Sequence, residues 1–317
     1  MFSEKNEWKK YYLKNVIKYT KLKLGLNKFV DKQFVDRDII SIENANDIIY
    51  ERIASGKPFM LARLGETEVR AIADALGIRL GAKRNADKER LKRLYNNAGV
   101  FPYGEDMEIR FMEYYCRFLS EADVLGVWNT FMQDYIIDKY VGLNTILTEL
   151  KSLEPYYNKL PWSRALQGKK VLVIHPFSES IKKQYLKREQ LFDNNDILPE
   201  FELTTLQAVQ TIAGCKDDRF NNWFEALDYM YDEAMKRDFD VAILGCGAYG
   251  FPLAARIKKA GKQAIHLGGA TQILFGIKGT RWDNHPFISK LYNSNWIRPD
   301  ESEKPTNSGS VENSCYW

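Results

Sequence analysis

The chain has 317 residues, of which 45% are hydrophobic and 28% are charged, and its net charge is +4. This composition is typical of a folded globular protein, and so small a charge, without an RNA-binding, zinc-finger or helix-turn-helix signature, argues against a nucleic-acid partner. No apolar run approaches the roughly 20 residues of a membrane-spanning helix. Four scattered cysteines without a Cys-x-x-Cys pair, together with the lack of a signal peptide, predict free thiols in the cytoplasm.

Residues 1–40 differ from the rest and predict an N-terminal helical extension. Between residues 5 and 28, lysines alternate with aromatic and aliphatic side chains, which is typical of a basic amphipathic helix. Such a helix can bind peripherally to an anionic membrane, here the inner face of the cell membrane. The other interpretation is a helix that packs on the domain with its lysines in water.

Residues 41–298 predict one α/β domain. In its first half we expect a strand at 58–63, a helix at 69–76, and helices over 86–122 that are interrupted at 99–104. A buried strand follows at 124–128. A proline-containing stretch near 151–168 could separate two subdomains.

The second half alternates strands and helices more clearly. The expected strands are 170–174, 202–205, 239–244 and 263–267, and the expected helices are 179–192, 223–237 and 251–260. This alternation predicts a Rossmann-like parallel sheet with helices on both faces. Residues 299–317, rich in Ser, Asn, Glu and Pro, predict a disordered tail.

A glycine-rich turn follows the strand 239–244 and opens a helix. Its glycines are Gly245, Gly247 and Gly250, with Tyr249 between them. Glycines allow a ligand to approach the backbone closely, and free amides at a helix start attract phosphate. The alternative is tight strand-to-helix packing without a ligand. The turn also resembles the first motif of S-adenosylmethionine-dependent methyltransferases, but no acidic residue ends the next strand to hold a ribose.

An acidic turn follows the strand 58–63. It contains Arg63, Gly65, Glu66 and Glu68. Two carboxylates so spaced can hold Mg²⁺ or Mn²⁺ with phosphate oxygens, or one of them can act as a general base. The planar fork of the arginine suits paired phosphate oxygens. The alternative is that both glutamates only complement the dipole of a helix start.

Four further residues are candidates for contacts with a diphosphate at the carboxyl edge of the sheet. His175 ends a strand, and Ser178 begins the helix that follows it. Lys278 and Arg281 lie in a late loop and could neutralise phosphate charge. The alternatives are a structural histidine and an ordinary surface loop.

The acidic turn and the glycine turn with its following helix and strand resemble the corresponding regions of GT-D type glycosyltransferases. The likeness covers about residues 55–285, and it differs at Glu66 and Thr67, where the family has Asp and Gly. The resemblance implies a GT-D-like fold and a nucleoside diphosphate sugar donor, with UDP-sugar favoured. It further implies a divalent metal near Glu66 and Glu68, and a glycan, glycoprotein or lipid-linked acceptor in bacterial surface polysaccharide synthesis.

Two other functions stay open. One is an S-adenosylmethionine-dependent methyltransferase, and the other is a non-catalytic partner in a polysaccharide-assembly complex. Homo-oligomerisation is compatible with the sequence as well.

Overall fold

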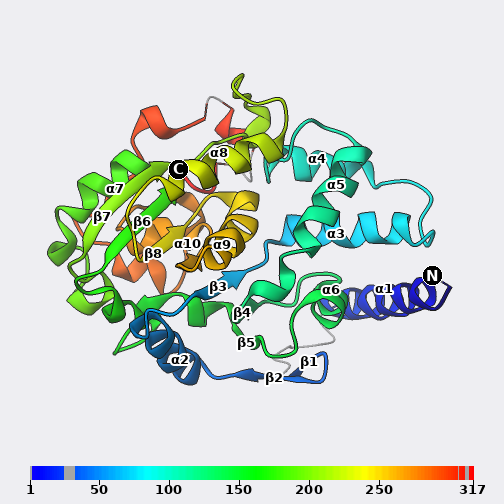
Figure 1. Ribbon diagram of the computed structural model, residues 1–317, viewed down its shortest axis with the longest axis horizontal. Coiled ribbons are helices and arrows are strands. Elements are labelled where there is room, and N and C mark those ends of the chain that lie inside the picture. Colours follow the sequence, from blue (N-terminus) through cyan, green and yellow to red (C-terminus); the bar gives the residue numbers. More distant parts are fainter. Residues whose placement is uncertain (1, 25–32, 306, 311–313) are drawn as a thin grey trace.

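Strands and helices alternate along the chain in the computed structural model, which describes residues 2–24, 33–305, 307–310 and 314–317 (Figure 1). The described strands are β1 (Gln33–Phe34), β2 (Arg37–Ile40), β3 (Phe59–Arg63), β4 (Val124–Val127), β5 (Ile146–Glu149), β6 (Lys170–His175), β7 (Glu202–Gln207), β8 (Val241–Leu244) and β9 (Gln263–His266). The described helices are α1 (Phe2–Lys23), α2 (Ile42–Ala54), α3 (Glu66–Arg79), α4 (Lys88–Asn96), α5 (Glu105–Cys116), α6 (Gln133–Tyr140), α7 (Ser178–Tyr185), α8 (Trp223–Met235), α9 (Gly250–Lys259) and α10 (Ala270–Leu274).

The nine described strands form one sheet in the order β1-β2-β5-β4-β3-β9-β8-β6-β7. Only β1 is antiparallel to its neighbour, and all the other described pairings are parallel. The central strand β3 pairs with β4 on one side and with β9 on the other. The sheet therefore joins the two halves of the chain across the stretch 151–168.

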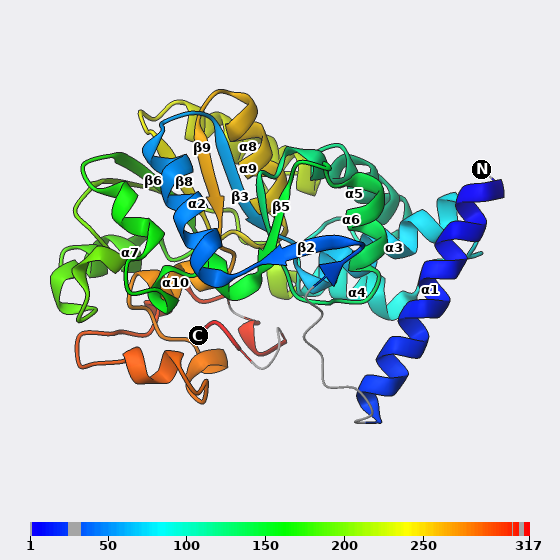
Figure 2. The ribbon, with the colours of Figure 1, turned by 90° about the horizontal axis from the view of Figure 1, so that it is seen from below.

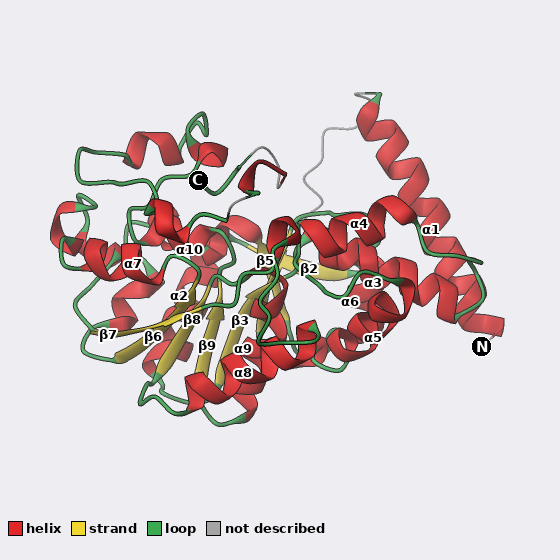
Figure 3. Cartoon of the chain, turned by 90° about the horizontal axis from the view of Figure 1, so that it is seen from above, coloured by secondary structure: helices red, strands yellow, loops and turns green. Residues whose placement is uncertain are grey.

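Helices cover both faces of this sheet, as the sequence predicted. Side chains alternate along each strand, so Leu172 of β6 packs on the face covered by α3, α5, α8 and α9, while Val171 packs on the opposite face. The second face is covered by α2, α7 and α10, and the short turns between residues 150 and 166 also pack there. Figures 2 and 3 show the two helical layers on either side of the strands.

The six strands that the sequence predicted are all present, but it missed β1, β2 and β5. These three strands have at most four residues, and β2 and β5 leave several side chains partly exposed. They therefore lack the continuous apolar run that marks a buried strand. The helix predicted at 179–192 ends earlier, because α7 stops at Tyr185.

Part of the segment 299–317, for which the sequence predicted a disordered tail, packs on the domain among the residues that the structure describes. Cys315 and Trp317 are buried, and Trp317 packs edge-to-face on Phe177 with ring centroids 6.1 Å apart. Glu303 is buried at the start of α7. The composition of this segment did not predict these contacts. A few apolar side chains are enough to pack a mostly polar segment onto a hydrophobic core.

The N-terminal extension forms α1, which lies at the end of the molecule farthest from β7 in Figures 1 and 3. The last part of the predicted amphipathic segment, residues 25–28, lies outside the described residues. Within the described part of the chain, none of the helices combines the length and apolar character that crossing a bilayer demands. All four cysteines are free thiols, as the sequence predicted.

Candidate functional site

Two adjoining cavities open at the carboxyl ends of the parallel strands, where open α/β sheets bind their ligands. The larger has a volume of about 720 Å³, and its wall is formed by segments that follow β3, β4, β5, β8 and β9 together with α4 and the C-terminal segment. The smaller has a volume of about 90 Å³ and lies behind the ends of β6, β7 and β8. Asn97, Ala98, Gly247, Gly269 and Tyr316 line both.

Arg63 is the last residue of β3 and reaches the larger cavity. Burial lowers the pKa of its guanidinium, against the opposing effect of Glu154 and Glu68. The guanidinium lies over the ring of Trp128, 5.5 Å from the centroid, and no hydrogen bond or ion pair joins it to another described residue. Arg63 is half-buried, and a partly desolvated arginine without a carboxylate partner among the described residues favours an anionic ligand.

Glu66 and Glu68 begin α3 and line the same cavity, but each is already engaged. Glu66 Oε1 lies 2.7 Å from Arg70 Nε in an ion pair. The buried carboxylate of Glu68 folds back over Gly65, where an added Cβ would lie only 2.0 Å from Oε2. Only glycine at position 65 leaves room for this arrangement.

This geometry does not provide a metal site built from protein ligands alone. Among the described residues, no group of three or more His, Cys, Asp or Glu side chains is placed to hold a metal ion. The ion pair with Arg70 further occupies one of the two carboxylates assigned to a metal.

Glu154 is a carboxyl group that the sequence analysis missed. It lines the larger cavity beyond the end of β5, and the hydroxyl of Tyr156 donates a hydrogen bond to its Oε2. Burial raises the pKa of Glu154, while the hydrogen bond from Tyr156 and the charge of Arg63 lower it. No motif surrounds this residue, and β5 itself was not recognised, so the sequence carried no signal for it.

The glycines of the turn after β8 serve two different purposes. An added Cβ at Gly245 would lie 2.4 Å from Cδ2 of His175, and one at Gly250 would lie 2.2 Å from the ring of His266. These two glycines therefore allow close packing. Gly247 differs, because it has a φ of +57°, meets nothing within 4 Å and lines both cavities.

The smaller cavity has an aromatic wall. His175, Tyr249 and Trp317 line it, and the Tyr249 hydroxyl lies 2.9 Å from Thr211 Oγ1 while its ring stacks on Trp223. Burial lowers the pKa of His175 to about 3, so this imidazole is neutral near pH 7. Its Nδ1 accepts a hydrogen bond from the Phe177 amide at 3.0 Å.

The C-terminal segment closes one side of the larger cavity. Arg281 lies over the ring of Tyr316, 4.7 Å from its centroid, and its Nη1 is 3.3 Å from the Tyr316 hydroxyl. The ring of Tyr316 approaches Gly269, where an added Cβ would be 2.7 Å away. The sequence pointed to Arg281 but not to Tyr316, which lies in the segment predicted to be disordered.

Two of the predicted contact residues lie elsewhere. Neither Ser178 nor Lys278 belongs to the described residues that line the cavities. Ser178 follows the helix cap rather than forming it, and the carboxylate of Glu303 accepts the Glu179 amide at 2.8 Å. The start of α7 is thus occupied by a carboxylate of the protein itself. Lys278 Nζ instead lies 5.3 Å from the ring centroid of Tyr292.

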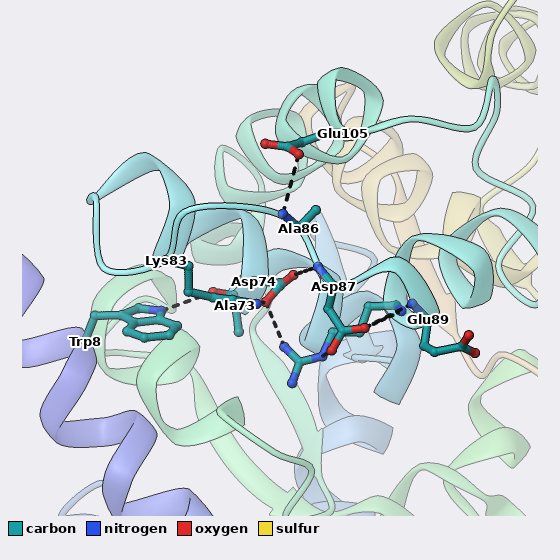
Figure 4. A network of polar contacts seen from close by, with 9 residues as sticks. Trp8, Ala73, Asp74, Lys83, Ala86, Asp87, Glu89 and Glu105 are labelled. Atoms are coloured by element: carbon teal, nitrogen blue, oxygen red, sulfur yellow. Dashed lines mark hydrogen bonds and ion pairs between the residues drawn. The ribbon is translucent and has the colours of Figure 1, made fainter.

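A buried polar network supports the wall formed by α4 (Figure 4). Asp74 of α3 contacts Lys83, accepts a hydrogen bond from Arg90 Nη1 at 3.1 Å, and accepts the Asp87 amide at 2.9 Å. Asp87 caps α4 by accepting the amides of Glu89 and Arg90. Because Arg90 also lines the larger cavity, the network fixes one of its cationic side chains in place.

Comparisons with known proteins bear on this site. The family model described as a GT-D fold-like domain matches residues 40–274, a range that contains Arg63, Glu154 and the glycine turn. The comparison with curated proteins finds no match. A solved structure titled "Selenomethionine substituted structure of domain of unknown function 1792 (DUF1792)" is similar at 12% identity and a TM-score of 0.43, covering 84% of this chain and 92% of that chain.

Proposed function

This chain belongs to the GT-D-like family, and we propose that it transfers a sugar from a nucleoside diphosphate donor to a hydroxyl group of a glycan or lipid-linked acceptor. The family has a glycosyltransferase-type fold, which supports glycosyl transfer as the class of reaction. The donor, the acceptor and the pathway are our proposal, with a UDP-sugar favoured as the donor and bacterial surface polysaccharide as the product.

The observation that carries the proposal is the half-buried guanidinium of Arg63, which lines the cavity and forms no ion pair with any described residue. Two charge-assisted hydrogen bonds from its planar fork match two oxygens of a diphosphate. Negative charge grows on that diphosphate as the sugar departs, so a fixed cation beside it stabilises the transition state. Arg281 lines the same cavity and would add a second positive charge.

In this proposal each of the two cavities binds a different part of the donor. A diphosphate beside Arg63 and Gly247 leaves the smaller cavity to the nucleobase, because its wall is aromatic and its histidine is neutral. The sugar and the acceptor occupy the larger cavity, whose volume lies within the range of roughly 300–1,000 Å³ typical of small-molecule sites.

Glu154 is our candidate for the proton acceptor. Its carboxylate takes the proton of the acceptor hydroxyl, the acceptor oxygen forms a bond to the anomeric carbon, and the bond from that carbon to the diphosphate oxygen breaks. The nucleoside diphosphate leaves with the electron pair, beside Arg63. Glu66 and Glu68 stay candidates from the sequence, but the Arg70 ion pair and the fold over Gly65 give them structural duties as well.

We propose that a divalent cation binds only together with the donor. Mg²⁺ is commonly bound by one or two carboxylates together with substrate phosphates. Mn²⁺ or Mg²⁺ would here need the diphosphate of the donor for most of its ligands, with Glu66 released from Arg70. Titration with Mn²⁺ in the absence of nucleotide should then give no calorimetric binding signal, and saturable binding without nucleotide would contradict this view.

A thermal-shift screen against nucleoside diphosphates and their sugars, with and without Mn²⁺, tests the proposal. A ligand that binds only the folded state raises the unfolding midpoint. A rise with a uridine or other nucleoside diphosphate, followed by release of that diphosphate in the presence of acceptor, supports the transferase. A rise with S-adenosylmethionine alone would identify a methyltransferase, and no rise with either would favour a non-catalytic partner.

A further inference from the structure

The N-terminal helix α1 presents two opposite faces, of which one docks on the domain. Trp8 is buried, and its Nε1 donates a hydrogen bond to the Ala73 carbonyl at 3.1 Å. Further along, the buried Asn15 donates to Asp134 Oδ1 at 2.8 Å and accepts the Met132 amide at 2.9 Å. These contacts hold the helix firmly against α3 and α6, so its orientation relative to the domain is set.

The opposite face is apolar but exposed. Leu13 and Ile17 are spaced so that they share one side of the helix, and Leu24 follows its last residue; their exposed fractions are 61%, 56% and 66%. Leu13 follows Trp8 by five residues, which places it about 140° further around the helix. The docked face therefore cannot cover this stripe. An apolar stripe in water indicates a partner that is absent here.

Lysines flank the stripe on both sides. Helix α1 contains seven lysines and two glutamates, a net charge of +5. Lys9 lies on one side of the stripe, and Lys10, Lys14 and Lys21 lie on the other. All four are exposed, and no ion pair joins any of them to a described residue. The partner must therefore offer an apolar surface for the stripe and negative charge for the lysines on both sides of it.

We propose that the outward face of α1 lies flat on an anionic lipid surface. Leucine and isoleucine side chains would enter the boundary between headgroups and acyl chains, while the lysines reach the anionic headgroups on both sides. Each lysine near such a surface adds to the electrostatic attraction. A second copy of the same helix fits less well, because it would bring two such sets of lysines together.

The position of α1 makes this contact accessible. The helix lies along the outer end of the molecule in Figures 2 and 3, away from the strands β6 and β7. Trp8 of α1 bonds to the carbonyl of Ala73 in α3, and the next residue, Asp74, pairs with Arg90, which lines the larger cavity (Figure 4). If the transferase function proposed above holds, this rigid link keeps the site beside a membrane that carries the lipid-linked acceptor.

Vesicle flotation with the full chain tests the proposal without any measurement of activity. Protein is mixed with vesicles of phosphatidylcholine alone or of an equimolar mixture with phosphatidylglycerol. We expect flotation only with the mixture and loss of flotation at high salt, because screening weakens attraction between exposed charges. The double variant Leu13→Ser with Ile17→Ser should bind at least about tenfold more weakly, since two buried apolar side chains are lost.

The matched control is Leu143→Ser with Leu186→Ser. These leucines are 90% and 84% exposed and lie far from α1 in the sequence, so the same chemical change should leave flotation intact. Equal thermal midpoints of both double variants would show that the fold survives. Absence of flotation by the wild type, or wild-type flotation of the Leu13 and Ile17 variant, would overturn the proposal. So would a dimer in light scattering that only this variant loses, because the stripe would then bind a second copy.

Discussion

The guanidinium of Arg63 lies over the indole of Trp128, with Cζ 5.5 Å from the ring centroid. Arg63 ends β3, and Trp128 follows β4, so two neighbouring parallel strands bring the pair together at the edge of the sheet. Trp128 Nε1 donates to the Leu64 carbonyl at 2.9 Å, which holds the indole in position. The arginine is thereby oriented by a ring rather than by a carboxylate, and its five N–H donors are left for a ligand.

Replacing Arg63 with Met should separate binding from stability. The variant removes a half-buried charge that has no ion-pair partner among the described residues, so the thermal midpoint should stay the same or rise. Binding of a nucleoside diphosphate should weaken by about 10- to 100-fold, because hydrogen bonds to charged groups contribute roughly 1.5–3 kcal/mol. Calorimetric titration measures the affinity.

Arg110→Met is the control for this change, because Arg110 also lies over an aromatic ring, that of Phe224, but does not line either cavity. Unchanged affinity in Arg63→Met would remove this arginine from the donor site.

Glu154→Gln should lower the rate of sugar transfer by about 10²–10⁴-fold with little change in donor affinity, since a general base contributes that much. Glu68→Gln and Glu66→Gln, measured beside it, compare the carboxylates that the sequence favoured. Single-turnover rates of the three variants show which carboxylate takes part in the chemical step. If Glu154→Gln transferred sugar at the normal rate and Glu68→Gln were inactive, Glu68 and not Glu154 would be the general base.

The pH dependence of the transfer rate should reflect the titration of Glu154. Burial raises the pKa of Glu154, so activity should fall on acidification at a higher pH than for an ordinary glutamate. The hydrogen bond from Tyr156 stabilises the carboxylate and lowers that pKa, so Tyr156→Phe should shift the acidic limb of the rate profile to still higher pH. An unshifted limb in this variant would mean that another group titrates there.

Glu108 should make the fold less stable as the pH rises. Both of its carboxylate oxygens are buried without a hydrogen-bond partner among the described residues, and burial raises the pKa from 4.5 to about 7. Between these values the unfolded chain releases a proton that the folded chain keeps, so the free energy of unfolding falls with increasing pH. The full difference is on the order of 3 kcal/mol.

Urea unfolding at about pH 5 and about pH 8 measures this effect. Glu108→Gln cannot ionise and should lose less stability between the two pH values than the wild type does. Glu113→Gln, at a position that forms a surface ion pair with Arg79, should behave like the wild type. Equal pH dependence in all three proteins would contradict the pKa assigned to Glu108.

Gly250→Ala should destabilise the fold by about 2 kcal/mol, because the added methyl group overpacks the ring of His266. Gly309→Ala is a suitable control, since nothing lies within 4 Å of a Cβ at that position. Thermal unfolding of the two variants tests this directly. Equal midpoints would show that the helix after the glycine turn can move away from β9.

The sequence alone determined the class of fold. The strands predicted at 170–174 and 239–244 contain the continuous apolar runs 171–174 and 241–244, and parallel strands buried on both faces require such runs. The glycine turn and the acidic turn were also recognised at the ends of strands. Both turns could be recognised because glycines and helix starts depend on the conformation of a few neighbouring residues.

Only the tertiary structure decided which residues meet in the cavities. Glu154 follows a partly exposed strand that has no apolar run, and Tyr316 comes from a segment whose composition suggested disorder, yet both line the same cavity as Arg63. The structure also assigned Gly245 and Gly250 to packing against two histidines, and gave the start of α7 to Glu303 rather than to a ligand. Local patterns predict which elements form, because propensity and periodicity act within a few residues. Contacts between residues more than a hundred positions apart depend on strand order and packing, which no local pattern encodes.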